Sequence, residues 1–129
     1  MHLVTYLAGR SPCLSAVWRD VALDSSRPMG PALVTVDEAP DPQALGIRLR
    51  VNGETRQEAS TAEMIFGVAA LLASLSAGMR LGSGDVPATG TPAGVGAASG
   101  RHLEPGVVVE AEIDGLGTLQ NPVVAPGAA

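Results

Sequence analysis

The chain has 129 residues, of which 46% are hydrophobic, 16% charged and 2% aromatic, and its formal net charge is -5. This length suits one domain whose core is built from Val, Leu, Ile and Ala. Because the 8 Lys and Arg residues provide no basic stripe, we expect neither nucleic acid nor an anionic membrane surface as a partner.

The first residues and the cysteine content indicate the cellular compartment in which we expect the protein. Residues 1–6 contain neither a basic region nor a long apolar one, so no signal peptide is evident. Cys13 is the single cysteine, and a lone thiol fits a reducing compartment. The apolar run from Met64 to Met79 is shorter than the roughly 20 residues of a membrane span. We therefore expect a cytoplasmic protein without a membrane segment.

Two short β-favouring runs open the chain, at residues 3–6 and 14–18, and a turn-like segment between them predicts a small hairpin. A linker with two prolines follows. We therefore divide the chain into a strand pair in 1–24 and a larger part, 25–129. Cys13 begins the second run, and without a nearby histidine we interpret it as a packed thiol rather than a nucleophile.

The next segment predicts strands. Residues 32–36 form a short apolar run typical of a buried strand. In 45–51, apolar residues alternate with Arg48 and Arg50, which predicts one apolar and one charged face. Asn52-Gly53 then favours a two-residue hairpin turn, with residues 55–57 as the returning strand. The arginines have two interpretations, as a solvent-facing surface or as groups that bind an anionic substrate.

A capping box, Ser60-Thr61-Ala62-Glu63, predicts the start of a helix at Ser60. Apolar residues recur from Met64 to Leu75 at helical spacing and predict one core-facing side. Gly78 stands where a left-handed residue would end the helix.

The segment from Gly84 to Gly96 contains glycines, prolines and two threonines, Thr89 and Thr91, and predicts a loop. Glycines that take positive φ let backbone N–H groups approach a ligand, and the hydroxyls add donors. We interpret the loop as one that binds an anion. It is no P-loop, because no lysine follows its last glycine.

The carboxy-terminal part predicts a turn at residues 100–106 and a strand at 107–113. His102 in the turn could act as a general base, although its segment holds no paired acid. Glu110 and Glu112 project from the same side of the strand, a spacing that suits a divalent cation.

Several motifs together resemble the fumarylacetoacetate hydrolase superfamily. They are the loop Thr89-Gly90-Thr91-Pro92 followed by Gly94-Val95-Gly96, the closing Gly115-Leu116-Gly117-Thr118-Leu119-Gln120-Asn121, and, upstream, Gly30-Pro31, Val51-Asn52-Gly53-Glu54 and Met64-Ile65-Phe66. The resemblance covers residues 28–124. It implies a mainly β fold with one α-helix (α+β), a truncated form of the family's mixed β-roll.

The resemblance also implies a site. Family members hydrolyse, decarboxylate or isomerise small 2-oxo or 1,3-diketo acids with Mg²⁺ or Mn²⁺. Thr91 matches the threonine that hydrogen-bonds the substrate carboxylate, with the backbone of Gly90 beside it. The family's metal-binding Glu-x-Glu pair lies on a different strand from Glu110 and Glu112, before the Gly-Pro turn. We therefore assign Thr91 and Gly90 to substrate binding.

The family's metal-binding segment has no counterpart between Asp24 and Gly30, where only five residues remain. We therefore assign no metal ligand and no catalytic residue. Two hypotheses stay open: an impaired enzyme of the family, or a non-catalytic remnant that binds a small carboxylate or dimerises. Because missing strands would leave sheet edges unpaired, we also expect self-association, most simply as a homo-oligomer.

Overall fold

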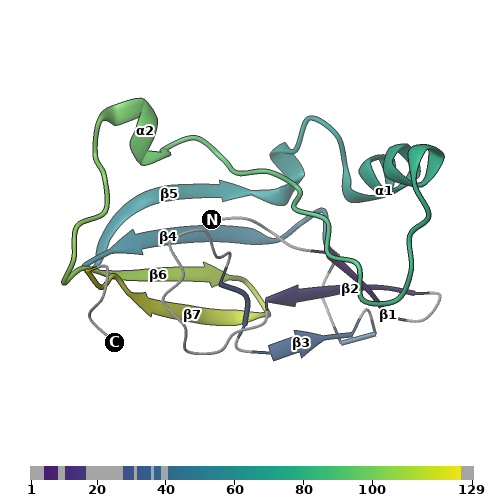
Figure 1. The fold of residues 1–129 in the computed structure, drawn as a ribbon, viewed down its shortest axis with the longest axis horizontal. Helices are drawn as coiled ribbons and strands as arrows, with labels where there is room; N and C mark the ends of the chain where they lie inside the picture. Colours follow the sequence, from purple (N-terminus) through teal and green to yellow (C-terminus); the bar gives the residue numbers. More distant parts are fainter. Residues whose placement is uncertain are drawn as a thin grey trace.

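The computed structural model describes residues 5–8, 11–16, 28–30, 32–35, 37–38 and 41–125. The described strands form two antiparallel sheets, a three-stranded sheet in the order β1-β2-β3 and a four-stranded sheet in the order β5-β4-β6-β7 (Figure 1). The elements are β1 (Thr5–Ala8), β2 (Ser11–Ala16), β3 (Ala32–Val34), β4 (Gly46–Val51), β5 (Glu54–Ser60), the 3₁₀ turn η1 (Thr61–Glu63), α1 (Val68–Gly78), α2 (Gly96–Ser99), β6 (Val108–Ile113) and β7 (Gly117–Pro122).

The three-stranded sheet begins with the predicted hairpin. β1 and β2 pair antiparallel, with Tyr6 opposite Cys13. β3 then pairs with β2 and ends at Val34, two residues before the predicted end of this strand. Val36 lies outside the described residues.

The hairpin of β4 and β5 is confirmed. Asn52 has a φ of 49° and Gly53 a φ of 78°, so both turn residues are left-handed, as a two-residue hairpin turn of this kind requires. The register shifts next to the turn, because Leu49 pairs with Gln57 and Arg50 with Thr55. The extra residue of this bulge is therefore Arg56.

The predicted start of the helix is wrong. The capping box at Ser60 is present, but it caps only the turn η1. Met64 has a ψ of 130° and Gly67 a ψ of 161°, so both residues are extended, and the two residues between them form a bend. Met64 and Ile65 consequently lie outside the helix, and Ile65 is 91% exposed.

The predicted end of the helix also differs. Gly78 is the last residue of α1 and has no positive φ, since the chain continues in extended conformation at Met79. Within α1 only Val68 is buried, so the helix covers the sheet less than the predicted apolar side implied. None of the described helices is long and apolar enough to span a bilayer.

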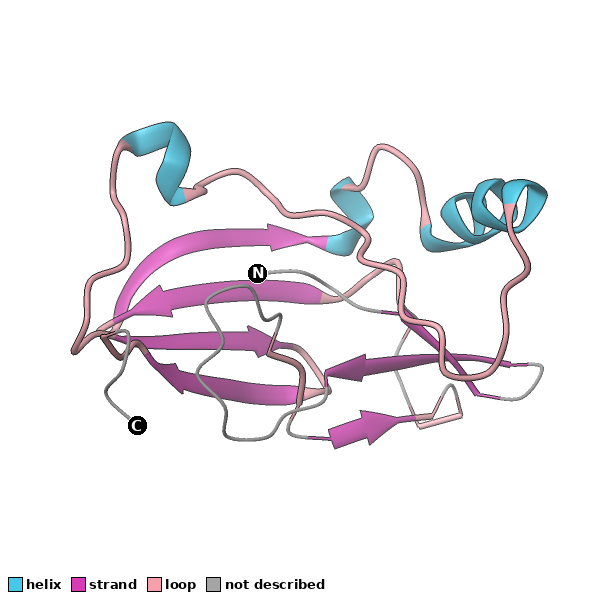
Figure 2. Ribbon diagram, viewed as in Figure 1, coloured by secondary structure: helices cyan, strands magenta, loops and turns pink. Residues whose placement is uncertain are grey.

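The core of the described part lies at one end of the four-stranded sheet. Leu45, Ile47 and Ile113 are buried together, and Leu116 packs against them. The predicted fold class, mainly β with one α-helix (α+β), is confirmed in α1 and the two sheets (Figure 2). The one-turn helix α2 is an addition that the sequence did not predict. A long loop joins α1 to α2 and runs back along β5 (Figures 1 and 2).

Candidate functional site

The glycine-rich segment is a loop, as predicted, up to Val95. Gly84, Gly90 and Gly94 have φ values of 102°, 108° and 98°, a region of backbone conformation that side chains disfavour. Gly96 departs from the prediction, because it begins the one-turn helix α2.

A buried side chain, Gln57 of β5, holds residues 91–93 of this loop against the sheet. Gln57 is only 3% exposed. Its amide Nε2 lies within hydrogen-bond distance of three acceptors, the hydroxyl oxygen of Thr91 at 3.1 Å and the carbonyl oxygens of Pro92 and Ala93 at 2.9 and 3.1 Å, which share its two hydrogens. These contacts join residues more than thirty positions apart in sequence. They fix the loop beside β5.

Gly94 allows this approach. A β-carbon at Gly94 would overlap the carbonyl oxygen of Arg56 and crowd the Gln57 side chain. Both the positive φ and the close contact therefore require glycine at this position.

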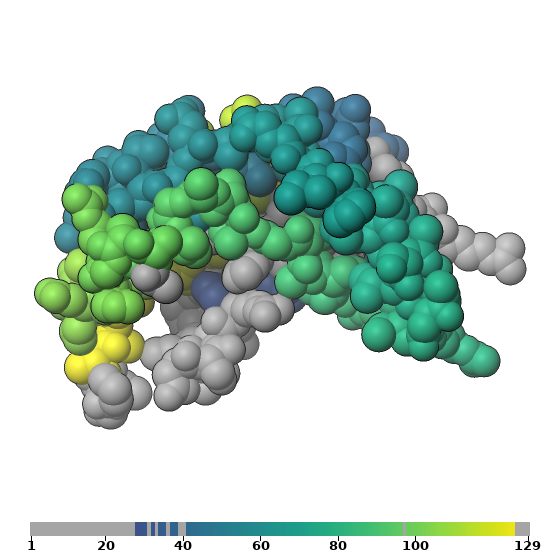
Figure 3. Space-filling view, turned by 90° about the horizontal axis from the view of Figure 1, so that it is seen from above, coloured from purple at the N-terminus to yellow at the C-terminus, as the bar shows by residue number. Residues whose placement is uncertain are grey.

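The loop forms one wall of a cavity of about 420 Å³. In the space-filling view the green atoms of the loop and the teal atoms of the segment after β5 meet on one surface (Figure 3). The cavity is lined by Ile47, Glu58, Ala59, Ser60, Thr61, Glu63, Met64, Ile65, Phe66, Leu71, Thr89, Gly90, Thr91, Pro92 and Ala93.

The opposite wall is held by Gln43. Its Oε1 accepts a hydrogen bond from the Val68 N–H at 2.5 Å, and its Nε2 donates to the Thr61 carbonyl at 3.1 Å. Gln43 thus satisfies an N–H at the start of α1, where Gly67 offers no capping side chain. The buried Thr61 hydroxyl in turn accepts from the Leu45 N–H at 2.8 Å.

The two predicted binding residues lie together in this cavity. Thr91 is exposed, and Gly90 faces open space, since a β-carbon added there would have no neighbouring atom within 4 Å. Because the Thr91 oxygen already accepts from Gln57, its hydroxyl proton is directed elsewhere and can be donated to an anion.

Sequence reasoning misses Gln57 and Gln43 as supports of the site. The pattern places Gln57 only in a returning strand, and Gln43 in no element. The one available signal for Gln57 is a polar residue in register with the apolar positions of its partner strand, since it pairs with Leu49.

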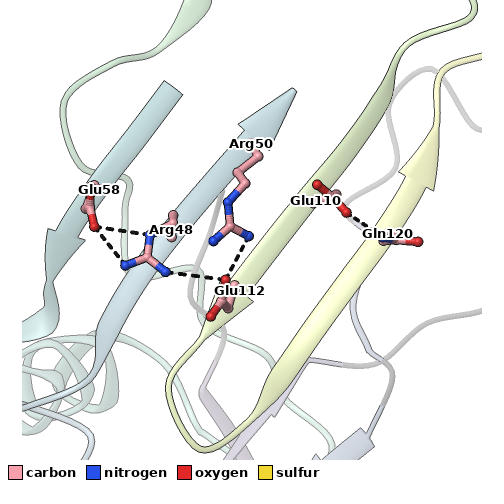
Figure 4. Close-up of polar contacts among 6 residues, drawn as sticks. All are labelled: Arg48, Arg50, Glu58, Glu110, Glu112 and Gln120. Carbon is pink, nitrogen blue, oxygen red and sulfur yellow. Dashed lines mark hydrogen bonds and ion pairs between the residues drawn. The ribbon is translucent and has the colours of Figure 1, made fainter. Parts of the chain in front are cut away.

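The other face of the sheet carries a ladder of charges, which we call the arginine–glutamate ladder: Arg48, Arg50, Glu58 and Glu112 (Figure 4). Arg48 binds Glu58 at 2.8 Å, and Arg50 binds Glu112 at 2.9 Å. The hydrogen bond and charge of Glu58 raise the pKa of the Arg48 guanidinium above its usual value. The arginines of the predicted charged face are thus paired with glutamates of the same face.

The Glu-x-Glu pair of β6 belongs to this face. Glu112 contacts two arginines, and Glu110 accepts from the Gln120 amide at 2.5 Å. Their closest partners are therefore cationic and amide groups (Figure 4). His102 is exposed in the loop after α2 and does not line the 420 Å³ cavity.

The fold, the motifs and the clamped threonine loop define a class. The sequence profile of the fumarylacetoacetate (FAA) hydrolase C-terminal domain matches residues 8–124. The chain belongs to the fumarylacetoacetate hydrolase family.

Two curated relatives are particularly similar. Oxaloacetate tautomerase YisK of Bacillus subtilis (strain 168) is 43% identical over 104 residues, which are 79% of this chain and 35% of that protein. The mitochondrial oxaloacetate tautomerase fahd2 of Xenopus laevis is 50% identical over 103 residues, which are 78% of this chain and 32% of that protein. The chain thus spans about a third of the length of these relatives.

Among solved structures, the chain resembles maleylpyruvate hydrolase from Sphingobium sp. SYK-6 in complex with manganese(II) and pyruvate. The TM-score is 0.78 at 30% identity, over 95% of this chain and 52% of that one. In this chain, the described residues contain no group of three or more His, Cys, Asp or Glu side chains that could hold a metal ion. We therefore derive no step through a metal. The sequence predicts that the whole chain lacks metal ligands. Because that prediction includes residues outside the described ranges, it stays a prediction.

Proposed function

We propose that the chain binds the carboxylate of a small 2-oxo acid at the loop of residues 89–93, as the carboxylate-binding part of a fumarylacetoacetate hydrolase-type site. The observation that carries this proposal is the Gln57 clamp, which immobilises the loop and leaves the Thr91 hydroxyl free to donate. Similarity to oxaloacetate tautomerases and to a pyruvate complex supports the substrate class.

The chemistry of the loop suits a carboxylate. The Thr91 hydroxyl donates one hydrogen bond, and Gly90 leaves room for the ligand to approach the backbone. A hydrogen bond to a charged group contributes about 1.5–3 kcal/mol. The described residues thus bind and orient, and we assign none of them a proton-transfer step.

The test is the affinity for pyruvate, measured by calorimetry with and without Mg²⁺ or Mn²⁺. Thr91→Val should weaken binding about tenfold or more, because it removes the donor. Thr91→Ser keeps the hydroxyl and should retain most of the affinity. Thr118→Val is a matched control, since Thr118 lies on β7 and does not line the cavity.

Two results would contradict the proposal. One is a wild-type chain that does not bind pyruvate in either metal condition. The other is a Thr91→Val variant that binds as tightly as Thr118→Val. Turnover of oxaloacetate, followed in the same samples, separates an active family member from the non-catalytic alternative, and we expect it to be low.

A further inference from the structure

The cavity has two chemically different walls. The loop wall carries hydroxyl and backbone groups, whereas the wall after β5 is formed by Met64, Ile65, Phe66 and Leu71. Ile65 is 91% and Phe66 64% exposed. A ligand held at Thr91 therefore has exposed apolar surface across the cavity from its carboxylate.

The charged residues that line the described cavity are all acidic. Among the described residues that line the cavity there are two acidic ones, Glu58 and Glu63, and no arginine, lysine or histidine. Glu58 stands at the edge shared with the arginine–glutamate ladder, where Arg48 pairs with it, so Glu63 is the acidic lining group without an arginine partner among the described residues. Arg48, Arg50 and Arg56 each form an ion pair of 2.8–3.1 Å with a carboxylate. Arg56 also has two buried nitrogens, Nε and Nη1, without a hydrogen-bond partner among the described residues, but it does not line the cavity. The described walls thus offer no cation to a second carboxylate on the ligand.

From these two observations we infer that the site prefers a 2-oxo monocarboxylate with an apolar tail over a 2-oxo dicarboxylate. The inference rests on the proposed binding of the first carboxylate at Thr91. An apolar tail would cover Ile65 and Phe66 and remove their surface from water. A second carboxylate would lose hydration against the same wall and would be repelled by Glu63.

The volume agrees with a ligand larger than pyruvate. A cavity of about 420 Å³ lies in the range of small-molecule sites of roughly 300–1,000 Å³. Pyruvate has only three carbon atoms and would leave the apolar wall uncovered.

The test uses a matched pair of ligands. In 4-methyl-2-oxopentanoate an isopropyl group replaces the distal carboxylate of oxaloacetate, so the two ligands have nearly the same shape. We expect the isopropyl compound to bind about tenfold more tightly than freshly dissolved oxaloacetate, because each methylene buried contributes about fourfold. Equal or tighter binding of oxaloacetate would overturn the inference.

Two variants locate the preference. Phe66→Ala should weaken binding of 4-methyl-2-oxopentanoate about fivefold, and it should weaken pyruvate binding less. Glu63→Gln keeps an oxygen that can accept from the Ser60 N–H, as Glu63 does at 3.3 Å, and should strengthen oxaloacetate binding about threefold. A ligand preference unaltered by either variant would also overturn it.

The outcomes distinguish the two proposals. If pyruvate fails to bind, the proposed function itself is wrong. If pyruvate binds through Thr91 and the matched pair shows no preference for the apolar tail, only the inference about substrate class is wrong.

Discussion

The two faces of the four-stranded sheet are stabilised in opposite ways. On one face, the arginine–glutamate ladder joins half-exposed charges across neighbouring strands. On the other, one buried neutral amide, Gln57, holds a distant loop. Exposed ion pairs contribute little to stability, whereas removal of a buried donor leaves its acceptors without a hydrogen bond. The carboxylate site therefore depends on few groups, whereas substitutions in the arginine–glutamate ladder should have little effect on stability.

The largest expected effect is at Gly94. Gly94→Ala should destabilise the fold by about 3 kcal/mol. The new β-carbon would overlap the Arg56 carbonyl oxygen, and alanine disfavours the positive φ at this position. Chemical denaturation would measure the loss. Gly53→Ala is the matched control, since Gly53 also has a positive φ but open space around it, and should cost about 1 kcal/mol. Equal losses would show that the loop does not contact β5 closely.

Next in size is the clamp itself. Gln57→Leu keeps the volume but removes the donor, so we expect a loss of about 2 kcal/mol and weaker pyruvate binding. The control, Gln120→Leu, removes an exposed amide on β7 that contacts Glu110, and should change stability by about 0.5 kcal/mol or less. A Gln57→Leu variant with wild-type pyruvate affinity would mean that the loop needs no clamp.

A smaller effect is expected at Gln43. Gln43→Ala removes the acceptor for the Val68 N–H and should cost about 1 kcal/mol, the usual effect of losing a helix cap. Hydrogen exchange should then accelerate in the first turn of α1. Unchanged exchange there would show that α1 does not depend on this contact.

The smallest effect is expected in the ladder. Arg48→Met breaks two ion pairs of partly exposed side chains and should cost less than about 1 kcal/mol, with a smaller loss in high salt. Pyruvate affinity should stay at the wild-type value. A marked loss of affinity would contradict the separation of the two faces.

Local patterns predict the sheet well. The Asn52-Gly53 turn and the alternation along β4 are short-range features that depend on backbone conformation and strand period, so they can be recognised without knowing what packs nearby. The loop character of residues 84–95 is predictable for the same reason, because its glycines disfavour regular structure.

The helix boundary and the clamp cannot be predicted in this way. A capping box stabilises one turn, but it does not determine whether the chain continues as a helix, and here Met64 leaves it. Gln57 and its acceptors are separated by more than thirty residues. Such a contact depends on how the loop folds back, which no local pattern encodes.

The most direct test of the carboxylate site is an NMR titration of the ¹⁵N-labelled chain with pyruvate. We expect the amide shifts to concentrate at Gly90 and Thr91, with smaller changes at Gln57 through its contact with the loop. In Thr91→Val the same shifts should require about tenfold or more pyruvate. Shifts that concentrate instead on the arginine–glutamate ladder, or that persist unchanged in Thr91→Val, would contradict it.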